Sequence, residues 1–450
     1  MNLMGLTAPR RTSTFRNWAG NQVCVPREIL RPGSADELAA IVRRASEGGL
    51  TVKAVGSGHS FTDAACTHGI LVSLDRLAAV EAVDTVRCRV TVQAGIRLDA
   101  LNRQLDQAGL AMPNLGDIDR QSLAGATATA THGTGLGLGN LATAIVGMDI
   151  VDGRGQLIRC DEHERPDLLQ VARVGIGALG IVTRVTLQCV PAFDLHAVET
   201  VEPLDDLLDG FEQQMAGHDH MEFFWVPGAR RAHVKRNNRT GEPRRPQNRL
   251  VEARDKMLYE NVLFGLANRT VRRFPSLAPT VARMTSGAAA RRDFVDASHR
   301  VFVSRRLVRF YEMEYGVPVA AVPEAVRRIG ALVRGLPSPV TFPVEVRVSA
   351  ADDIPLSTAY GRDTGWFACH VYAGTPYLAF FQGVEAIAAD YGGRPHWGKL
   401  HFHDHRSLAP LYPEWDRFQR VRSELDPDGT FANTYTDRVL GPVGRAESSL

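Results

Sequence analysis

One stretch of the sequence, residues 125–139, consists almost entirely of small residues and limits what this chain can fold into. Its sequence is GATATATHGTGLGLG. A segment with so little side-chain volume buries too little apolar surface to form an ordinary core. Small residues are required where a backbone must approach another group closely. The regular Ala/Thr alternation and the single His132 favour a binding segment over the simpler alternative, a low-complexity loop.

Composition is that of an ordinary globular protein with two or three domains. The chain has 450 residues, of which 44% are hydrophobic and 23% charged, and its formal net charge is +2. Such a balanced charge argues against bulk nucleic-acid binding. The six cysteines are scattered without a C-x-x-C pair, which predicts a reduced chain with neither disulfides nor a thiolate metal site.

Signals for export or membrane insertion are weak. No apolar run approaches the ~20 residues that span a bilayer. Arg10 and Arg11 form a twin arginine, but residues 12–22 are polar, so we predict no export signal. We expect a cytoplasmic protein, with peripheral contact at the inner face of the membrane as the alternative.

The first region alternates between strands and helices. Ser34 and Glu37 have capping-box spacing, and the apolar positions after them predict a helix that ends at Gly48. The spacing of Leu98, Leu101 and Leu105 predicts a second helix. Strands are predicted at Leu50–Val55, Ile70–Leu74, Val90–Gln93, Ile145–Val151, Leu157–Cys160 and Ile181–Val190.

The middle of the chain has a different pattern of predicted elements and charge. It is predicted to contain strands at Val308–Tyr315, Val340–Val348 and Trp366–Tyr372, separated by helical patterns. Residues 230–249 are rich in arginine and lysine. We interpret them as a solvated loop; the alternative is a patch for an anionic membrane or an electron-acceptor protein.

Two glycine motifs differ in what they predict. Gly175, Gly177 and Gly180 form G-x-G-x-x-G, but the motif runs into a β-branched strand instead of a helix, which argues against a Rossmann domain. Residues 56–60, GSGHS, follow a strand, and consecutive N–H groups in such a turn can hold a diphosphate. His59 would lie beside the bound group.

Three motifs together resemble one flavoprotein superfamily. They are GSGHSFTDAACTHG at 56–69, GATATATHGTG at 125–135 and HWGK at 396–399. In this order the chain resembles the vanillyl-alcohol-oxidase (PCMH-type) flavoproteins, and within them the aldonolactone oxidoreductases: L-gulono-1,4-lactone oxidase or dehydrogenase and D-arabinono-1,4-lactone oxidase. The bacterial alditol oxidases are close relatives of this branch.

The resemblance implies an α+β fold with a two-subdomain FAD-binding domain and a cap domain that has a large antiparallel sheet and flanking helices. The implied divisions are an N-terminal tail (1–20), the FAD domain (21–192), the cap (193–394), a segment returning to the flavin (395–442) and a disordered tail (443–450).

The resemblance also implies which residues hold FAD, and that His59 carries it covalently; noncovalent FAD is the alternative. The implied cofactor-binding residues are Gly56, Ser57, Gly58, His59, Ser60, Gly116, Asp117, Ser122, Gly125, Ala126, Thr129, His132, Gly133, Gly177, Ile181, Val182 and Lys399.

Candidate catalytic residues lie in the last third of the chain. Strand alternation places Glu345 and Arg347 on one face. The resemblance implies that they face the flavin and substrate, that His370 lies near the substrate, and that Lys399 lies near the flavin N5. There a fixed ammonium would stabilise alkoxide character.

A metal site is not predicted. His401, His403 and His405 would share one face of a strand, but no cysteine or carboxylate cluster joins them.

The implied activity is FAD-dependent oxidation of the C2 hydroxyl of an aldono-1,4-lactone by hydride transfer to flavin N5, giving an ascorbate-type product. An alditol (xylitol or sorbitol) oxidase is the alternative. A noncatalytic protein that binds anionic surfaces is a remote second alternative. The implied partners are a sugar lactone or polyol and an electron acceptor, either O2 or a redox carrier such as a cytochrome.

Overall fold

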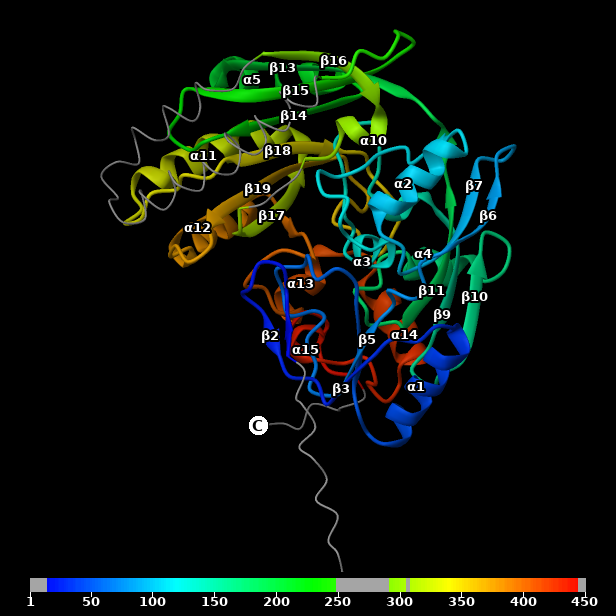
Figure 1. Cartoon of the computed structure of the whole chain (residues 1–450). Helices are drawn as coiled ribbons and strands as arrows, with labels where there is room; N and C mark the ends of the chain where they lie inside the picture. Colours follow the sequence, from blue (N-terminus) through cyan, green and yellow to red (C-terminus); the bar gives the residue numbers. More distant parts are fainter. Residues whose placement is uncertain (1–13, 248–290, 305–307, 444–450) are drawn as a thin grey trace, which may run out of the picture.

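The computed structural model describes residues 14–247, 291–304 and 308–443, which form two lobes (Figure 1). Arg10, Arg11, Arg249 and the tail from 444 onward lie outside the described residues. None of the described helices is long and apolar enough to cross a membrane. The lower lobe in Figure 1 contains the N-terminal strands, and the upper lobe is built on one large sheet.

The first part of the lower lobe is a small parallel sheet covered by one helix. Its strands, in sheet order, are β3 (Glu28–Leu30), β5 (Ile70–Ser73) and β4 (Val52–Val55). Helix α1 (Ala35–Glu47) buries Leu38, Val42 and Ala45. Ser34 Oγ accepts from the Glu37 N–H at 3.1 Å, as predicted. The Glu37 carboxylate accepts from Gly33 N at 2.6 Å, one residue before the position that a complete capping box requires.

The second part is a five-stranded antiparallel sheet. In sheet order its strands are β10 (Leu157–Asp161), β9 (Ile145–Val151), β11 (Ile181–Gln188), β7 (Arg89–Gln93) and β6 (Val80–Asp84). Around it lie α2 (Leu98–Gln107), α3 (Leu123–Ala128), η1 (Leu141–Ala144), α4 (Pro166–Ala172) and the pair β8 (Leu110–Ala111) and β12 (Val190–Pro191). The two sheets confirm the predicted two-subdomain cofactor domain.

The upper lobe is the predicted cap, an eight-stranded sheet with helices. In sheet order the strands are β16 (Arg292–Ala297), β13 (Asp194–Pro203), β15 (Arg231–Thr240), β14 (His220–Trp225), β18 (Val344–Ser349), β19 (Thr364–Tyr372), β17 (Phe310–Pro318) and β20 (Arg394–Pro395). The cap helices are α5 (Leu204–Asp209), α6 (Phe211–Ala216), α10 (Ser298–Val301), η4 (Val319–Ala321), α11 (Val322–Arg334) and α12 (Leu378–Ala389).

Alternation along the central strands separates the two faces of the cap sheet. Val344, Val346 and Val348 pack in a core with residues of α5, α6, α11 and α12. The residues between them therefore face the other side, toward the cofactor domain. Strand β18 starts four residues later than predicted, directly after Pro343, which has no N–H to donate to a neighbouring strand.

Half of the basic segment 230–249 is not a loop. Residues Arg231–Thr240 form β15, between β13 and β14. Cations of the segment meet carboxylates of neighbouring strands: Lys235 pairs with Glu222, Arg236 with Glu202, Arg244 with Asp194 and Arg245 with Asp293. The predicted loop is therefore wrong for Arg231–Thr240, whereas residues 241–246 are exposed. The ion pairs neutralise much of the positive charge, which weakens the alternative of a basic patch.

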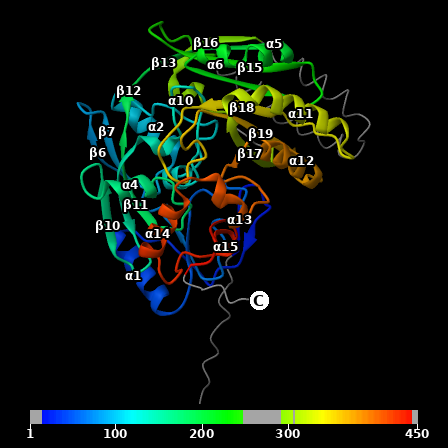
Figure 2. The same cartoon turned by 180° about the vertical axis from the view of Figure 1, so that it is seen from behind.

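Both ends of the described chain pack into the lower lobe. Strands β1 (Phe15–Arg16) and β2 (Val23–Cys24) pair, so residues 14–20 are not the predicted tail. At the other end, α13 (His405–Leu408), η5 (Ala409–Leu411), α14 (Trp415–Leu425) and α15 (Thr434–Leu440) lie beside the N-terminal strands (Figure 2). Residues 401–404 are not a strand, because the chain turns there to the Asp404 cap of α13, so the three histidines share no strand face.

Candidate functional site

A cavity of about 620 Å³ lies between the cofactor domain and the cap. One end is lined by Lys53, Gly177 and Val182, and the other by Glu312, His370 and Lys399. The predicted residues that line it are Gly56, Ser57, Gly58, His59, Ser60, Gly116, Asp117, Ser122, Gly125, Thr129, His132, Gly177, Ile181, Val182, Glu345, Arg347, His370 and Lys399. The fold therefore brings together segments that are hundreds of residues apart.

Two predicted cofactor-binding residues do not line the cavity. Ala126 belongs to helix α3 and is fully buried in the core of the cofactor domain. Gly133 is packed elsewhere: a Cβ there would lie 2.3 Å from Asn114 Oδ1 and from the Leu115 carbonyl oxygen. Both residues permit close packing behind the cavity wall, and the structure places neither of them in that wall.

The three sequence motifs converge on one loop. Gly56 follows β4 and lies so close to Ser122 that a Cβ would be 2.0 Å from Ser122 Oγ. That hydroxyl caps α3 by accepting from Gly125 N. On the other side, the Phe61 N–H donates to the Gly398 carbonyl at 2.8 Å. The GSGHS loop is thus held between the small-residue segment and the HWGK segment.

Lys53 is a buried lysine at the far end of the cavity that the sequence did not single out. Its Nζ donates to the carbonyls of Gly177 and Phe431, both at 3.0 Å. Burial, reinforced by the nearby Arg422, lowers the pKa of Lys53 to about 8. The lysine joins the Gly175–Gly180 turn to the C-terminal segment. That turn leads into β11 and not into a helix, which confirms the prediction that the G-x-G-x-x-G motif does not belong to a Rossmann domain.

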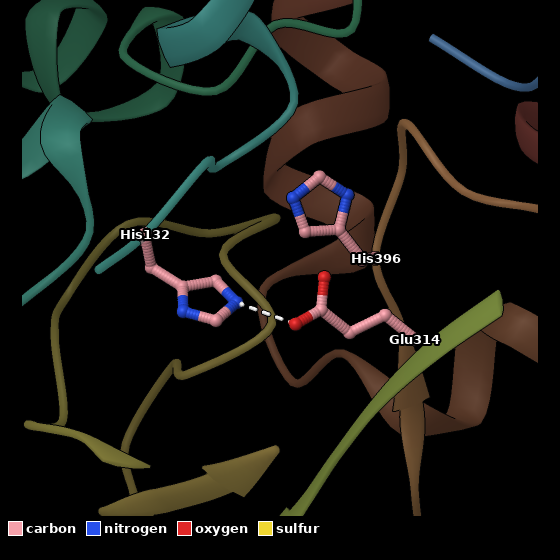
Figure 3. A group of neighbouring side chains, drawn as sticks. All are labelled: His132, Glu314 and His396. Carbon is pink, nitrogen blue, oxygen red and sulfur yellow. Dashed lines mark ion pairs between the residues drawn. The ribbon is translucent and has the colours of Figure 1, made fainter. Parts of the chain in front are cut away.

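The cap contributes a buried network around Arg347. Its guanidinium lies 2.6 Å from Glu314 Oε1 and 3.3 Å from Glu345 Oε1. His132, from the cofactor domain, approaches the same Glu314 oxygen at 3.3 Å (Figure 3). Burial alone would raise the pKa of Glu314, but Arg347 and His132 hold it well below its ordinary value. Glu314 is therefore a carboxylate that links the two lobes.

A second charged group surrounds Lys399. Its Nζ lies 2.5 Å from Glu312 Oε2, and His370 Nε2 lies 3.5 Å from Glu312 Oε1. Burial opposes ionisation of Glu312, yet Lys399 and His370 lower its pKa to about 2. His370 Nδ1 lies 2.8 Å from the Pro343 carbonyl oxygen, so Nδ1 carries a hydrogen and donates there, while Nε2 faces the Glu312 carboxylate.

Glu312 and Glu314 were not predicted, although the sequence carries a signal for them. In β17 they alternate with Met313 and Tyr315, which pack in the helix-side core. Two carboxylates at every second position of an otherwise buried strand require partners on the opposite face.

Two groups of donor atoms could in geometric terms hold a cation. His132, Glu314 and His396 form one, and Asp117, Glu222 and Glu345 the other; in each, one atom per residue lies within 4.8 Å of the others. Figure 3 shows both rings close to the Glu314 carboxylate, His132 beside it and His396 above it in this view. Arg347 already pairs with that carboxylate, and His396 Nδ1 accepts from Gly398 N at 3.0 Å. These partners favour an organic ligand over a metal at this site.

The cavity fits FAD. Its glycine-lined wall offers backbone N–H groups to a diphosphate. Among the described residues, Glu314 Oε2 is buried without a hydrogen-bond partner. A buried carboxylate oxygen in this state needs a donor from a bound molecule, and a flavin ring or a polyol can supply one.

Comparison with known proteins agrees with this geometry. The sequence model of an FAD-binding domain matches residues 26–161, and that of D-arabinono-1,4-lactone oxidase matches residues 185–439. An L-gulono-1,4-lactone dehydrogenase of Mycobacterium tuberculosis is 45% identical over 95% of this chain and 99% of its own. The L-gulonolactone oxidase of Bos taurus is 32% identical over 95% and 98%.

A solved cholesterol oxidase from Brevibacterium sterolicum shares the fold, with a TM-score of 0.80 and 18% identity over 97% of this chain and 99% of its own. These matches confirm the predicted resemblance and remove the remote alternative of a noncatalytic surface-binding protein. The chain therefore belongs to the D-arabinono-1,4-lactone oxidase family and is an FAD-dependent oxidoreductase.

Proposed function

We propose that this enzyme oxidises the C2 hydroxyl of an aldono-1,4-lactone of the L-gulono or D-arabinono type, giving a 2-keto lactone that enolises to an ascorbate-type product. The observation that carries the proposal is the pairing of buried charges, Arg347 with Glu314 and Glu345, and Lys399 with Glu312, at one end of a cavity that fits FAD. The names of the relatives support the substrate class.

In this proposal bound FAD, held by the GSGHS loop and the small-residue segment, would supply at N5 the two-electron acceptor for the hydride of the carbinol carbon. Arg347 and Lys399 donate hydrogen bonds to the lactone oxygens, because their positions are fixed by buried carboxylates. Glu345 Oε1 lies 3.3 Å from Arg347 but accepts no hydrogen bond within the described protein, so it can accept one from a substrate hydroxyl. The ammonium of Lys399 favours alkoxide character at the reacting oxygen.

Covalent attachment of FAD through His59 is part of the proposal. Burial and the cations Lys399, Arg120 and Arg97 lower the pKa of His59 to about 4. At neutral pH the imidazole is therefore uncharged and has a nucleophilic nitrogen. The electron acceptor is O2 or a redox carrier such as a cytochrome.

An anaerobic titration tests the substrate. L-Gulono-1,4-lactone should bleach the oxidised-flavin absorption of the purified enzyme, with xylitol as the matched polyol. Bleaching by xylitol alone would favour the alditol-oxidase alternative, and bleaching by none of L-gulono-1,4-lactone, D-arabinono-1,4-lactone and xylitol would contradict both.

Acid precipitation of the same protein tests the linkage. Flavin absorption should stay with the wild-type pellet and pass into the supernatant for His59→Ala. If the His59→Ala pellet remains yellow, the assignment of the link to His59 is wrong.

A further inference from the structure

The N-terminal hairpin, formed by β1, β2 and the residues between them (15–24), is hydrogen-bonded to the loop that contains His59. Four hydrogen bonds run from it to loop carbonyls: Trp18 N to Gly58 O at 2.8 Å, Asn17 Nδ2 to Ser60 O at 2.9 Å, and the amides of Asn21 and Gln22 to Phe61 O at 2.9 and 3.0 Å. These bonds fix the backbone on both sides of His59. The hairpin is consequently part of the cofactor site.

Trp18 also contacts the His59 ring directly. The two rings are stacked, with centroids 5.7 Å apart and planes inclined by 29°. Trp18 is held in turn by the edges of Phe61 and Phe310, at 6.4 and 5.3 Å. Phe310 belongs to β17 of the cap, so the indole lies where both lobes and the cavity meet.

Stacking restricts how the imidazole can turn. A histidine side chain rotates about two bonds, and a nucleophilic ring nitrogen reacts only when its lone pair points at the carbon it attacks. Among the described residues, the ring nitrogens of His59 make no hydrogen bond, so the stack with Trp18 is the contact that orients the ring.

We propose that Trp18 is a positioning residue for flavin attachment: by stacking on His59 it holds the imidazole in the orientation from which a ring nitrogen bonds to the flavin 8α carbon. This inference rests on the covalent linkage proposed above. The attachment forms one N–C bond and breaks one imidazole N–H and one methyl C–H bond. Overall this is a two-electron oxidation that releases two protons. The two electrons pass to the flavin ring and from there to the electron acceptor of the enzyme.

The test follows attachment over time in the full-length chain. Wild type, Trp18→Ala and Trp18→Phe are each produced without flavin in riboflavin-starved cells and then incubated with excess FAD in air, and samples are denatured in acid. Flavin fluorescence of the protein band then gives the covalent fraction, and total flavin before denaturation gives binding. Trp415→Ala is the matched control, because Trp415 is also partly buried against a ring, that of Tyr412, but does not line the cavity.

We expect Trp18→Ala to bind FAD and to attach it at least about tenfold more slowly than wild type. Trp18→Phe retains a stacking ring and should attach FAD at close to the wild-type rate, and Trp415→Ala should match wild type. Rescue by phenylalanine separates orientation of His59 from a general loss of packing.

Three results would overturn the inference. Equal attachment rates in Trp18→Ala and wild type would remove the role of Trp18 while leaving the His59 linkage intact. A Trp18→Ala protein that binds no FAD, with Trp18→Phe equally deficient, would assign Trp18 to binding and not to orientation. Release of all flavin from the wild-type protein by acid would instead refute the linkage, and the inference with it.

Discussion

The two walls of the cavity are built by different means. The cofactor-domain wall contains many glycines, with Gly56, Gly116, Gly125 and Gly177 among its lining residues. The cap wall has six lining residues on three adjacent strands; all six are buried, and four of them (Glu312, Glu314, Glu345 and Arg347) are charged. A wall of backbone can follow the shape of a cofactor closely, whereas a wall of paired charges can orient and polarise a small polar substrate.

The energetic demands on the two walls also differ. Backbone groups carry no net charge, so their burial is satisfied by hydrogen bonds alone. The cap wall buries several ions whose desolvation is offset only by their mutual pairing. Removing one charge from the cap wall should therefore lower the free energy of unfolding far more than adding one methyl group to the cofactor-domain wall.

Arg347→Ala should give the largest effect. Both Glu314 and Glu345 would lose their counterion in a buried site, so we expect a loss of about 3–5 kcal/mol in the free energy of unfolding. Turnover of the lactone should fall about 1,000-fold because a fixed donor to the substrate is lost. Urea unfolding and steady-state kinetics measure the two effects.

Arg236→Ala is the matched control on the same sheet. Its ion pair with Glu202 is partly exposed, so its loss should cost about 1 kcal/mol or less and leave turnover unchanged. If Arg347→Ala costs no more stability than Arg236→Ala, the buried network does not contribute to stability as argued here.

Glu312→Gln should give a smaller effect that depends on pH. The folded-state pKa of Glu312 is about 2 and its ordinary value is 4.5. The ionised pair therefore stabilises the fold above pH 4.5, and this contribution is lost as the pH falls from 4.5 toward 2. We expect the variant to be less stable than wild type by about 2–3 kcal/mol at pH 7, with the difference shrinking toward pH 3.

Urea unfolding of both proteins between pH 3 and pH 7 measures that difference directly. Other depressed carboxyl groups, such as Glu199, are common to both proteins and cancel in the subtraction. A difference that stays constant with pH would show that Glu312 contributes by shape and not by charge.

The same contrast explains what the sequence could predict. The cofactor wall was largely predictable because glycine and small residues at ordered positions mark a backbone that contacts a ligand. Glu345, Arg347, His370 and Lys399 were named through the resemblance, and the structure places all four at one end of the cavity.

The partners of those residues were not predictable. Glu312 meets His370 only because β17 and β19 pair in one particular register, and register across a sheet is a long-range property. In the sequence Lys53 resembles any lysine in a strand, because its burial depends on the distant C-terminal segment that contains Phe431. Trp18 lay in what was taken for a tail, because two-residue strands leave no periodic pattern in a sequence.

Gly56→Ala probes the cofactor wall and should give the smallest effect. The new Cβ would lie 2.0 Å from Ser122 Oγ and 3.1 Å from Ser122 Cβ, so the loop or α3 must shift. In a His59→Ala background, where binding is reversible under our proposal, we expect the Kd for FAD to rise about tenfold without loss of the fold. Fluorescence titration with FAD measures it.

Ser122→Ala turns that experiment into a double-mutant cycle. Removing Oγ abolishes the closer of the two clashes but also the cap on α3, so the single variant should weaken FAD binding slightly. If steric overlap causes the loss in Gly56→Ala, the double variant should bind FAD more tightly than the sum of the single effects predicts. Strictly additive effects would mean that Gly56 is required for its backbone freedom or for contact with the cofactor, and not for the approach of the small-residue segment.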